Sequence, residues 1–138
     1  MVILPITTYT SFSFGIVSVI AFHKRLWLLG TLWQMLYGVS VLNHSLYYND
    51  YTLKKYVDIV DRTLAHTIII ISCHYAITQE LYIISLFMYW ICLSYMTHIY
   101  YIADLSHLPN GKGVKWHSQL HLAAFIGELF LFLGDVKK

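Results

Sequence analysis

Long apolar segments, separated by short polar breaks, follow one another along the 138-residue chain. A helix that crosses the hydrocarbon core of a bilayer, about 30 Å thick, needs roughly 20 mostly apolar residues. Five segments approach that length, at about residues 2 to 22, 26 to 48, 57 to 77, 81 to 103 and 115 to 134. Their apolar residues come in blocks, as in helices that satisfy their own backbone hydrogen bonds in lipid. The sequence therefore predicts an all-α fold, a polytopic membrane bundle of about five transmembrane helices in which residues 1–138 form a single domain.

The polar breaks indicate which helix ends lie on each side of the membrane. The longest break runs from Asp104 to Lys115, and its proline and glycines are typical of a loop. With five alternating spans, the amino terminus and the breaks near residues 49–56 and 104–116 share one side. Lysine and arginine are slightly more numerous there, with Lys54, Lys55, Arg62, Lys112 and Lys115 against Lys24, Arg25, Lys137 and Lys138. Since cytoplasmic loops carry an excess of these residues, we expect this side to be cytoplasmic.

Composition points to the same class of protein. Hydrophobic residues make up 58% of the chain and charged residues 12%, whereas soluble domains are about 45–50% apolar and about 25% charged. The nine Lys and Arg residues are spread between the segments, so we expect no nucleic-acid partner. No Lys or Arg precedes Lys24, which favours a first span over a cleaved signal peptide. Cys73 and Cys92 lie inside apolar segments and predict no disulfide.

Several polar side chains lie inside the predicted spans, at the ends assigned to the cytoplasmic side. Ser40 and His44 are four residues apart near the end of the second span, so they share a helical face. His117 and His121 repeat this spacing at the start of the fifth span, and Asp61 lies near the start of the third. Because ionisable groups are costly in a membrane and usually mark a functional site, we expect these residues to converge inside the bundle.

Convergence of these side chains favours a metal site. Three neutral imidazoles are a common ligand set for catalytic Zn²⁺, whose fourth position holds a water with a pKa lowered to about 7. We interpret His44, His117 and His121 as the candidate zinc ligands. Asp61 is the candidate to accept the proton of that water or to orient it. Ser40 is the candidate either to stabilise an oxyanion or to fix the carboxylate.

Four further ionisable residues have more than one interpretation. Asp58 lies one turn before the candidate aspartate and is either part of the site or a solvated charge at the start of a helix. His66 and His98 are either neighbours of the site or packing residues. Glu128 lies deeper in the fifth span, so we expect it to be protonated or paired with a polar group on another helix.

The order of these motifs resembles the signature of a known superfamily. Residues 40–44 read SVLNH, Asp61 follows, and residues 116–121 read WHSQLH. This order is similar to that of the membrane hydrolase superfamily that unites alkaline ceramidases, progestin and adipoQ receptors, and hydrolases that remodel lipid anchors. In that superfamily SxxxH lies on the second helix of the core, the aspartate on the third and HxxxH on the last.

The resemblance implies a zinc-dependent hydrolase. It implies that His44, His117 and His121 bind Zn²⁺ near the cytoplasmic end of the bundle, and that Ser40 and Asp61 complete the site. The implied reaction is hydrolysis of a lipid amide, such as the N-acyl bond of a ceramide, so the expected partners are a membrane lipid substrate and the bilayer. The gap from His44 to Asp61 is closer to that of the adipoQ receptor branch than to that of alkaline ceramidases, so the substrate does not follow from the fold.

The chain is shorter than the superfamily pattern, whose core has seven helices. Between the spans of Asp61 and His117 we find one span where the superfamily has three. The walls of a lipid cavity would then be incomplete. Two explanations stay open: a second copy, in a homo-oligomer, or another protein supplies the missing wall, or the shortened chain has lost catalytic power and its metal is structural.

Two other classes of function stay open at this point. A non-catalytic receptor-like or assembly protein would use the same polar residues to join helices, with a structural metal or none. A redox protein would hold haem between two histidines on facing helices. A di-iron desaturase is disfavoured, because it requires several histidine boxes and the chain has a single HxxxH.

Overall fold

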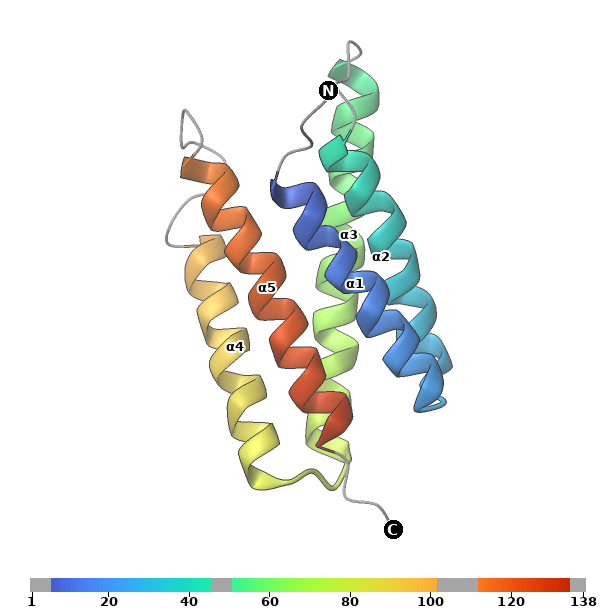
Figure 1. Ribbon diagram of the computed structural model, residues 1–138, viewed down its shortest axis with the longest axis vertical. Helices are drawn as coiled ribbons and strands as arrows, with labels where there is room; N and C mark the ends of the chain where they lie inside the picture. Colours follow the sequence, from blue (N-terminus) through green and yellow to red (C-terminus); the bar gives the residue numbers. More distant parts are fainter. Residues whose placement is uncertain (1–5, 46–50, 102–111, 135–138) are drawn as a thin grey trace.

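The structure, a computed structural model, describes residues 6–45, 51–101 and 112–134. These residues form five α-helices: α1 Ile6–His23, α2 Trp27–Ser45, α3 Tyr51–Thr78, α4 Ile83–Tyr101 and α5 Lys112–Leu133. The helices run alternately down and up the long axis of the molecule (Figure 1). The all-α prediction with five helices is confirmed.

Two helices begin earlier than the apolar segments predict. α3 begins at Tyr51 and α5 at Lys112, so the part of the expected break from Tyr51 onwards, which contains Lys54 and Lys55, is helical and not a loop. The prediction was wrong there because hydropathy marks only where apolar residues begin. Leucine and lysine are good helix formers, and they extend α3 beyond its apolar part. The predicted loop residues 104–111 lie outside the described residues.

A tight turn joins α1 and α2. The amide of Leu26 donates a hydrogen bond of 2.9 Å to the carbonyl of Ala21, and the amide of Arg25 donates one of 2.9 Å to the carbonyl of Phe22. These two bonds define a Schellman motif at the end of α1. Arg25 has a φ of 61°, the left-handed conformation that favours glycine. The turn lets α1 and α2 pack against each other along their lengths.

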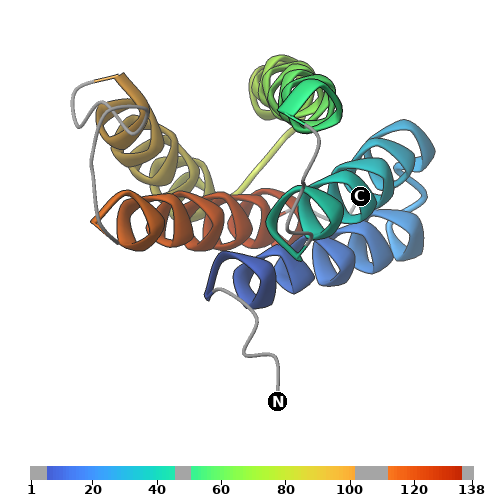
Figure 2. The same ribbon diagram turned by 90° about the horizontal axis from the view of Figure 1, so that it is seen from above.

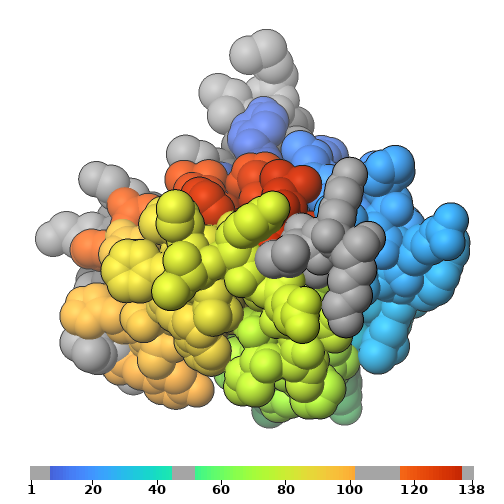
Figure 3. Space-filling model, turned by 90° about the horizontal axis from the view of Figure 1, so that it is seen from below, coloured from blue at the N-terminus to red at the C-terminus, as the bar shows by residue number. Residues whose placement is uncertain are grey.

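The helices form an open arc in which α3 and α4 stand apart. α1 packs against α2 and α5, α2 also packs against α3, and α4 packs against α5. Viewed from above, α3 and α4 lie on the same side of the layer formed by α5, α1 and α2, with a gap between them (Figure 2). At the other end of the molecule α3 and α4 lie side by side (Figure 3). There the amide of Tyr82 donates a 2.9 Å hydrogen bond to the carbonyl of Gly134, which joins the start of α4 to the end of α5.

The outer surface is rich in apolar side chains, and the interior holds many polar ones. Twenty-five large hydrophobic side chains are exposed in the described part of the chain, and every helix contributes some of them. By contrast, four hydroxyl side chains of α1 are at most 4% exposed, namely Thr7, Thr8, Ser11 and Ser18. Within the described residues, α4 is the one helix whose length and composition suffice to cross a membrane. Only 17% of the apolar stretch of α4 is buried inside the structure, whereas the core helix of a soluble protein is mostly buried.

Candidate metal centre

Three histidines from two helices meet near one end of the bundle. His44 lies in the last turn of α2, and His117 and His121 share one face of α5 because they are four residues apart. One possible ligand nitrogen from each ring lies within 4.8 Å of the other two. The ring centroids are 4.7 Å apart for His44 and His117, 5.4 Å for His44 and His121, and 4.6 Å for the pair on α5. The structure thus brings together all three of the histidines that the sequence pattern selected.

The donor set fits a zinc ion. Nε2 of His44 is buried and has no hydrogen-bond partner among the described residues, as expected of a nitrogen kept for a metal. Zinc–nitrogen bonds of about 2.0–2.1 Å put the nitrogens of one tetrahedral site roughly 3.4 Å apart. Small rotations of the three rings therefore suffice to bind one ion. Three imidazole ligands leave the fourth position open, which is the arrangement of catalytic zinc sites.

Helix α1 fixes the orientation of His121. Oγ1 of Thr10 lies 3.1 Å from Nδ1 of His121, and Oγ of Ser11 lies 3.4 Å from the same nitrogen. The ring of Phe14 packs against the imidazole with a centroid distance of 4.7 Å. Because these hydroxyl groups engage Nδ1, the other ring nitrogen, Nε2, is the one available to a metal. Partners of this kind commonly set the tautomer and orientation of metal-binding histidines.

The carboxylate of Asp61 is buried, and a hydrogen bond holds one of its two oxygens. It is 8% exposed, and Nδ2 of Asn43 donates a 3.1 Å hydrogen bond to its Oδ2. Its other oxygen, Oδ1, is buried and lacks a hydrogen-bond partner within the described parts of the chain. Asn43 precedes His44 on α2, so one turn of this helix supplies both a candidate ligand and the group that positions the carboxylate.

Ser40 lies behind the histidines and not in the cavity. Its side chain is fully buried, and its Oγ forms a 3.0 Å hydrogen bond with Oγ of Ser11. It also lies close enough to influence the carboxylate of Asp61. Ser40 is absent from the residues that line the cavity in the described structure. Two roles were considered for Ser40. Its position fits a residue that holds neighbouring polar side chains in place better than one that contacts an oxyanion.

Two of the residues with open roles have other partners. Asp58 forms an ion pair of 2.9 Å with Arg62, four residues later on α3, and both side chains are more than one-third exposed. Nδ1 of His66 donates a 2.6 Å hydrogen bond to the carbonyl of Arg62, and its ring packs edge-on against Tyr100 with a centroid distance of 5.5 Å. Both residues line the cavity beside the histidine cluster, and Nδ2 of Asn43 also donates a long hydrogen bond of 3.5 Å to Oδ1 of Asp58.

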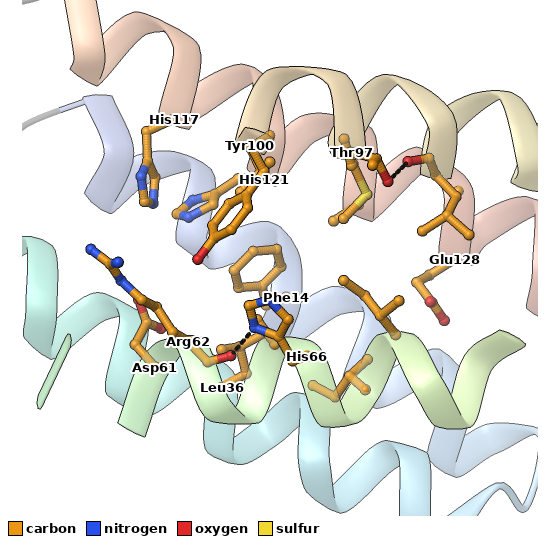
Figure 4. A pocket seen from close by; sticks show the side chains of 18 of the residues that line it. Phe14, Leu36, Asp61, Arg62, His66, Thr97, Tyr100, His117, His121 and Glu128 are labelled. Atoms are coloured by element: carbon orange, nitrogen blue, oxygen red, sulfur yellow. Dashed lines mark hydrogen bonds between the residues drawn. The ribbon is translucent and has the colours of Figure 1, made fainter. Parts of the chain in front are cut away.

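A cavity of about 650 Å³ extends from the histidine cluster between α3 and α4. His44, Asp61, His117 and His121 line one end of it, and all five helices contribute to its wall. Figure 4 shows His117 and His121 pointing into this space from α5, with Asp61 on the opposite side and Glu128 further along α5. Most of the other lining side chains are apolar, including Phe14, Leu36, Ile68, Leu93 and Ala124. The volume is in the range of cavities that hold small molecules, about 300–1,000 Å³.

Comparison with models of protein families, with curated proteins and with solved structures found no match for this chain. The resemblance described from the motifs therefore rests on those motifs alone. What the structure adds is the placement of their residues in one site.

Sequence reasoning missed the contribution of α1 and the role of Asn43. Thr10 and Ser11 were not selected, because a hydroxyl side chain in an apolar segment is an ordinary feature. A weak signal was present, since Thr7, Ser11 and Ser18 recur on one face of a segment that is otherwise strongly apolar. Asn43 lies inside the SVLNH motif, but nothing in the sequence paired its amide with Asp61.

Proposed function

We propose that this chain is a multi-pass membrane protein whose five helices all cross the bilayer. The distribution of side chains supports this proposal, because exposed apolar residues such as Ile16, Ile70 and Leu122 match lipid better than water. The hydroxyl residues lower the mean hydropathy of α1, but they face the interior, as polar residues of membrane helices usually do. The slight excess of lysine and arginine at that end supports a position of the histidine cluster near the cytoplasmic side.

We further propose that the protein is a zinc-dependent hydrolase that acts on the amide bond of a membrane lipid. The observation that carries this proposal is the cluster of three histidines, which shares the wall of a largely apolar cavity with the buried carboxylate of Asp61. His44, His117 and His121 are the residues that would hold the ion. When bound there, zinc supplies an activated water and a Lewis acid for an acyl carbonyl.

The surrounding residues have distinct roles in this proposal. Asp61 accepts a proton through Oδ1, the oxygen without a partner among the described residues, while Asn43 holds Oδ2 and so fixes the plane of the carboxylate. Ser40 acts as a positioning residue, because its hydroxyl contacts Ser11, which in turn lies 3.4 Å from Nδ1 of His121. The chain of hydroxyl groups thereby couples α2, α1 and α5 at the site.

The cavity favours a lipid as the substrate. Its apolar wall suits an acyl chain, and we propose that a lipid enters from the bilayer between α3 and α4, which both line the cavity and pack little against each other. An amide at the histidine end would have its chain along the rest of the cavity. We propose the N-acyl bond of a ceramide-like lipid as the bond that is hydrolysed. A second copy of the chain on the side of α3 and α4 stays a prediction, which chemical cross-linking in mild detergent would test.

A non-catalytic membrane protein is the second candidate. The observation that favours it is the set of contacts of Thr10 and Ser11 with His121, since such contacts also join helices in proteins without a metal. In this case the cluster would hold a structural ion or none, and it would stabilise the arrangement of α1, α2 and α5.

Hydrolysis of an N-acyl sphingosine by the purified protein distinguishes the two candidates. We expect turnover in the parent protein and a loss of about 100- to 10,000-fold in Asp61→Asn, with unchanged zinc content, because only the proton acceptor is removed. Asp58→Asn is the comparison variant: Asp58 lines the same cavity one turn away, but it is paired with Arg62 and receives only a long 3.5 Å hydrogen bond from Asn43, so its loss of turnover should be much smaller. A protein that binds zinc but releases no fatty acid would refute the hydrolase and support the non-catalytic candidate.

A further inference from the structure

The cavity ends partway along all five helices. Counted from the histidine end, the last residue that lines it on each helix is, in chain order, Phe14, Trp33, Ile69, Tyr89 and Glu128. Every helix continues past this level for more than one turn, and in the described structure none of the residues there lines the cavity. The cavity therefore has a floor inside the bundle and does not run through to the opposite end.

Tyr89 of α4 spans the floor from its own helix to two others. Its side chain is 3% exposed, and its hydroxyl group forms a 3.6 Å hydrogen bond with Sγ of Cys73 on α3. Its ring lies beside α5 at Gly127, where an added Cβ would be 3.8 Å from Cδ2 of the ring. Tyr89 thus connects α3, α4 and α5 at the level where the cavity ends.

The bundle below this floor is filled with packed side chains. Phe132 of α5 is fully buried, and its ring packs edge-on against Tyr75 of α3 with a centroid distance of 6.2 Å. The carboxyl group of Glu128 lies close enough to interact with Ser72 of α3 and Trp33 of α2. Since protein interiors are close-packed, a ligand that extends past the floor must displace such side chains.

The depth of the floor sets the length of chain that fits above it. Glu128 is seven residues after His121 on α5 (Figure 4), about 10 Å along the axis, and Ile69 is eight residues after Asp61 on α3, about 12 Å. An extended chain advances about 1.2 Å per bond, as an extended polypeptide does with three bonds per residue. The space between the metal centre and the floor therefore holds about 8 to 10 carbon atoms of an extended chain.

We propose that the cavity selects acyl chains of about ten carbon atoms, and that Tyr89 is the residue that sets this limit. The proposal rests on the proposed function for the class of ligand, an N-acyl lipid, but it requires neither hydrolysis nor a bound metal. A longer chain has to push the floor side chains aside. Forcing extra methylene groups into a packed core lowers an equilibrium constant about 5- to 150-fold.

Competition between N-decanoyl sphingosine and N-stearoyl sphingosine tests the proposal. Both lipids carry the same sphingosine chain, which keeps them in the detergent micelle. The Asp61→Asn variant in mild detergent is mixed with equal amounts of the two, so that hydrolysis does not consume them, and the bound ratio is measured by native mass spectrometry. We expect the decanoyl lipid to bind about 5- to 150-fold more tightly than the stearoyl lipid.

Substitutions at the floor should move the limit in both directions. Tyr89→Ala should remove most of the preference for the decanoyl lipid, whereas Tyr89→Phe, which keeps the ring and loses only the contact with Cys73, should retain it. Ala124 is 8% exposed and lines the cavity one turn above Glu128. Ala124→Leu should therefore favour N-hexanoyl over N-decanoyl sphingosine. Because leucine is a good helix former, this variant decides the matter if Tyr89→Ala does not fold.

The possible outcomes separate this proposal from the proposed hydrolase. Equal binding of the decanoyl and stearoyl lipids would overturn the length limit and leave the hydrolase standing, since a long chain would then leave the protein between α3 and α4. A decanoyl preference without release of fatty acid by the parent protein would support the limit and refute the hydrolase alone. Binding of neither lipid would overturn the acyl-chain site, and the proposed function with it.

Discussion

Removal of the hydroxyl groups that contact His121 tests whether α1 helps to hold a metal ligand. Thr10→Val and Ser11→Ala delete the two oxygen atoms that lie 3.1 and 3.4 Å from Nδ1, with little change in side-chain volume. We expect the double variant to bind zinc more weakly, because the imidazole is no longer held in one orientation and one tautomer.

The size of the effect follows from the two contacts. A hydrogen bond in a protein contributes about 0.5–1.5 kcal/mol net. The Thr10 contact has the length of a full hydrogen bond, whereas the Ser11 contact is long, so the pair should contribute roughly 1–2 kcal/mol. This free energy corresponds to zinc binding that is about 5- to 30-fold weaker. Loss of such supporting partners typically costs about 10- to 100-fold in metal affinity, which overlaps this range.

The assay is a competition between the metal-free protein and a chromogenic zinc chelator in mild detergent. Thr8→Val is the matched control, because Thr8 lies on the same helix, is fully buried, and has an Oγ1 without a hydrogen-bond partner in the described residues. Its substitution should leave zinc affinity unchanged. An unchanged affinity in the double variant, or an equal loss in Thr8→Val, would refute the role assigned to α1.

Three further predictions concern the fold and the membrane. Gly30→Ala should lower the thermal unfolding midpoint, because a Cβ there would lie 2.7 Å from the Phe22 ring. Gly38→Ala is the matched control, since open space surrounds Gly38, and it should stabilise α2 by about 0.5–1 kcal/mol. Equal effects of the two substitutions would contradict the close packing of α1 and α2. Arg25→Gly should stabilise the protein by about 1 kcal/mol in the same assay, because the backbone φ of 61° at this position strains any residue with a Cβ. A loss of stability would argue against the Schellman turn. Ile91 is exposed in the middle of α4. Ile91→Lys should reduce the fraction of the protein that stays in membranes after alkaline extraction, because a lysine at the centre of a span costs about 2.5–3.5 kcal/mol. An unchanged fraction would indicate that this face of α4 contacts water.

The sequence predicted the helices well because they depend on local patterns. Five apolar blocks of sufficient length gave five helices, and errors were confined to their ends. At Tyr51 and Lys112 the helix continues through polar residues, where hydropathy carries no information on helix formation. The tight turn at Arg25 was expected only as a polar break, and its left-handed backbone was not.

The sequence predicted those features of the candidate site that follow from helical spacing, because spacing determines which residues share a face of a helix. The i and i+4 spacing placed His117 and His121 on one face, and the alternation of the helices placed His44 at the same end of the bundle. Contacts between helices were not accessible in this way. The contact of Thr10 with His121 and the pairing of Asn43 with Asp61 join residues from different helices, and they depend on rotations and packing that no local pattern encodes.

The cavity is lined by residues of both α3 and α4, two helices that pack less against each other than against α2 and α5, respectively. The expectation that the wall between the helices of Asp61 and His117 is incomplete follows from the superfamily resemblance and stays a prediction. Chemical cross-linking in mild detergent tests whether a second copy covers this side of the cavity.

The most direct test of the metal centre is the zinc content of the purified protein. Elemental mass spectrometry of protein in mild detergent should give about one zinc per chain. The His117→Ala and His121→Ala double variant should lose it, whereas His74→Ala, an exposed histidine of α3, should retain it. Zinc-free parent protein, or a visible absorption band typical of haem in its place, would contradict the metal centre and leave a helix bundle whose histidines serve another purpose.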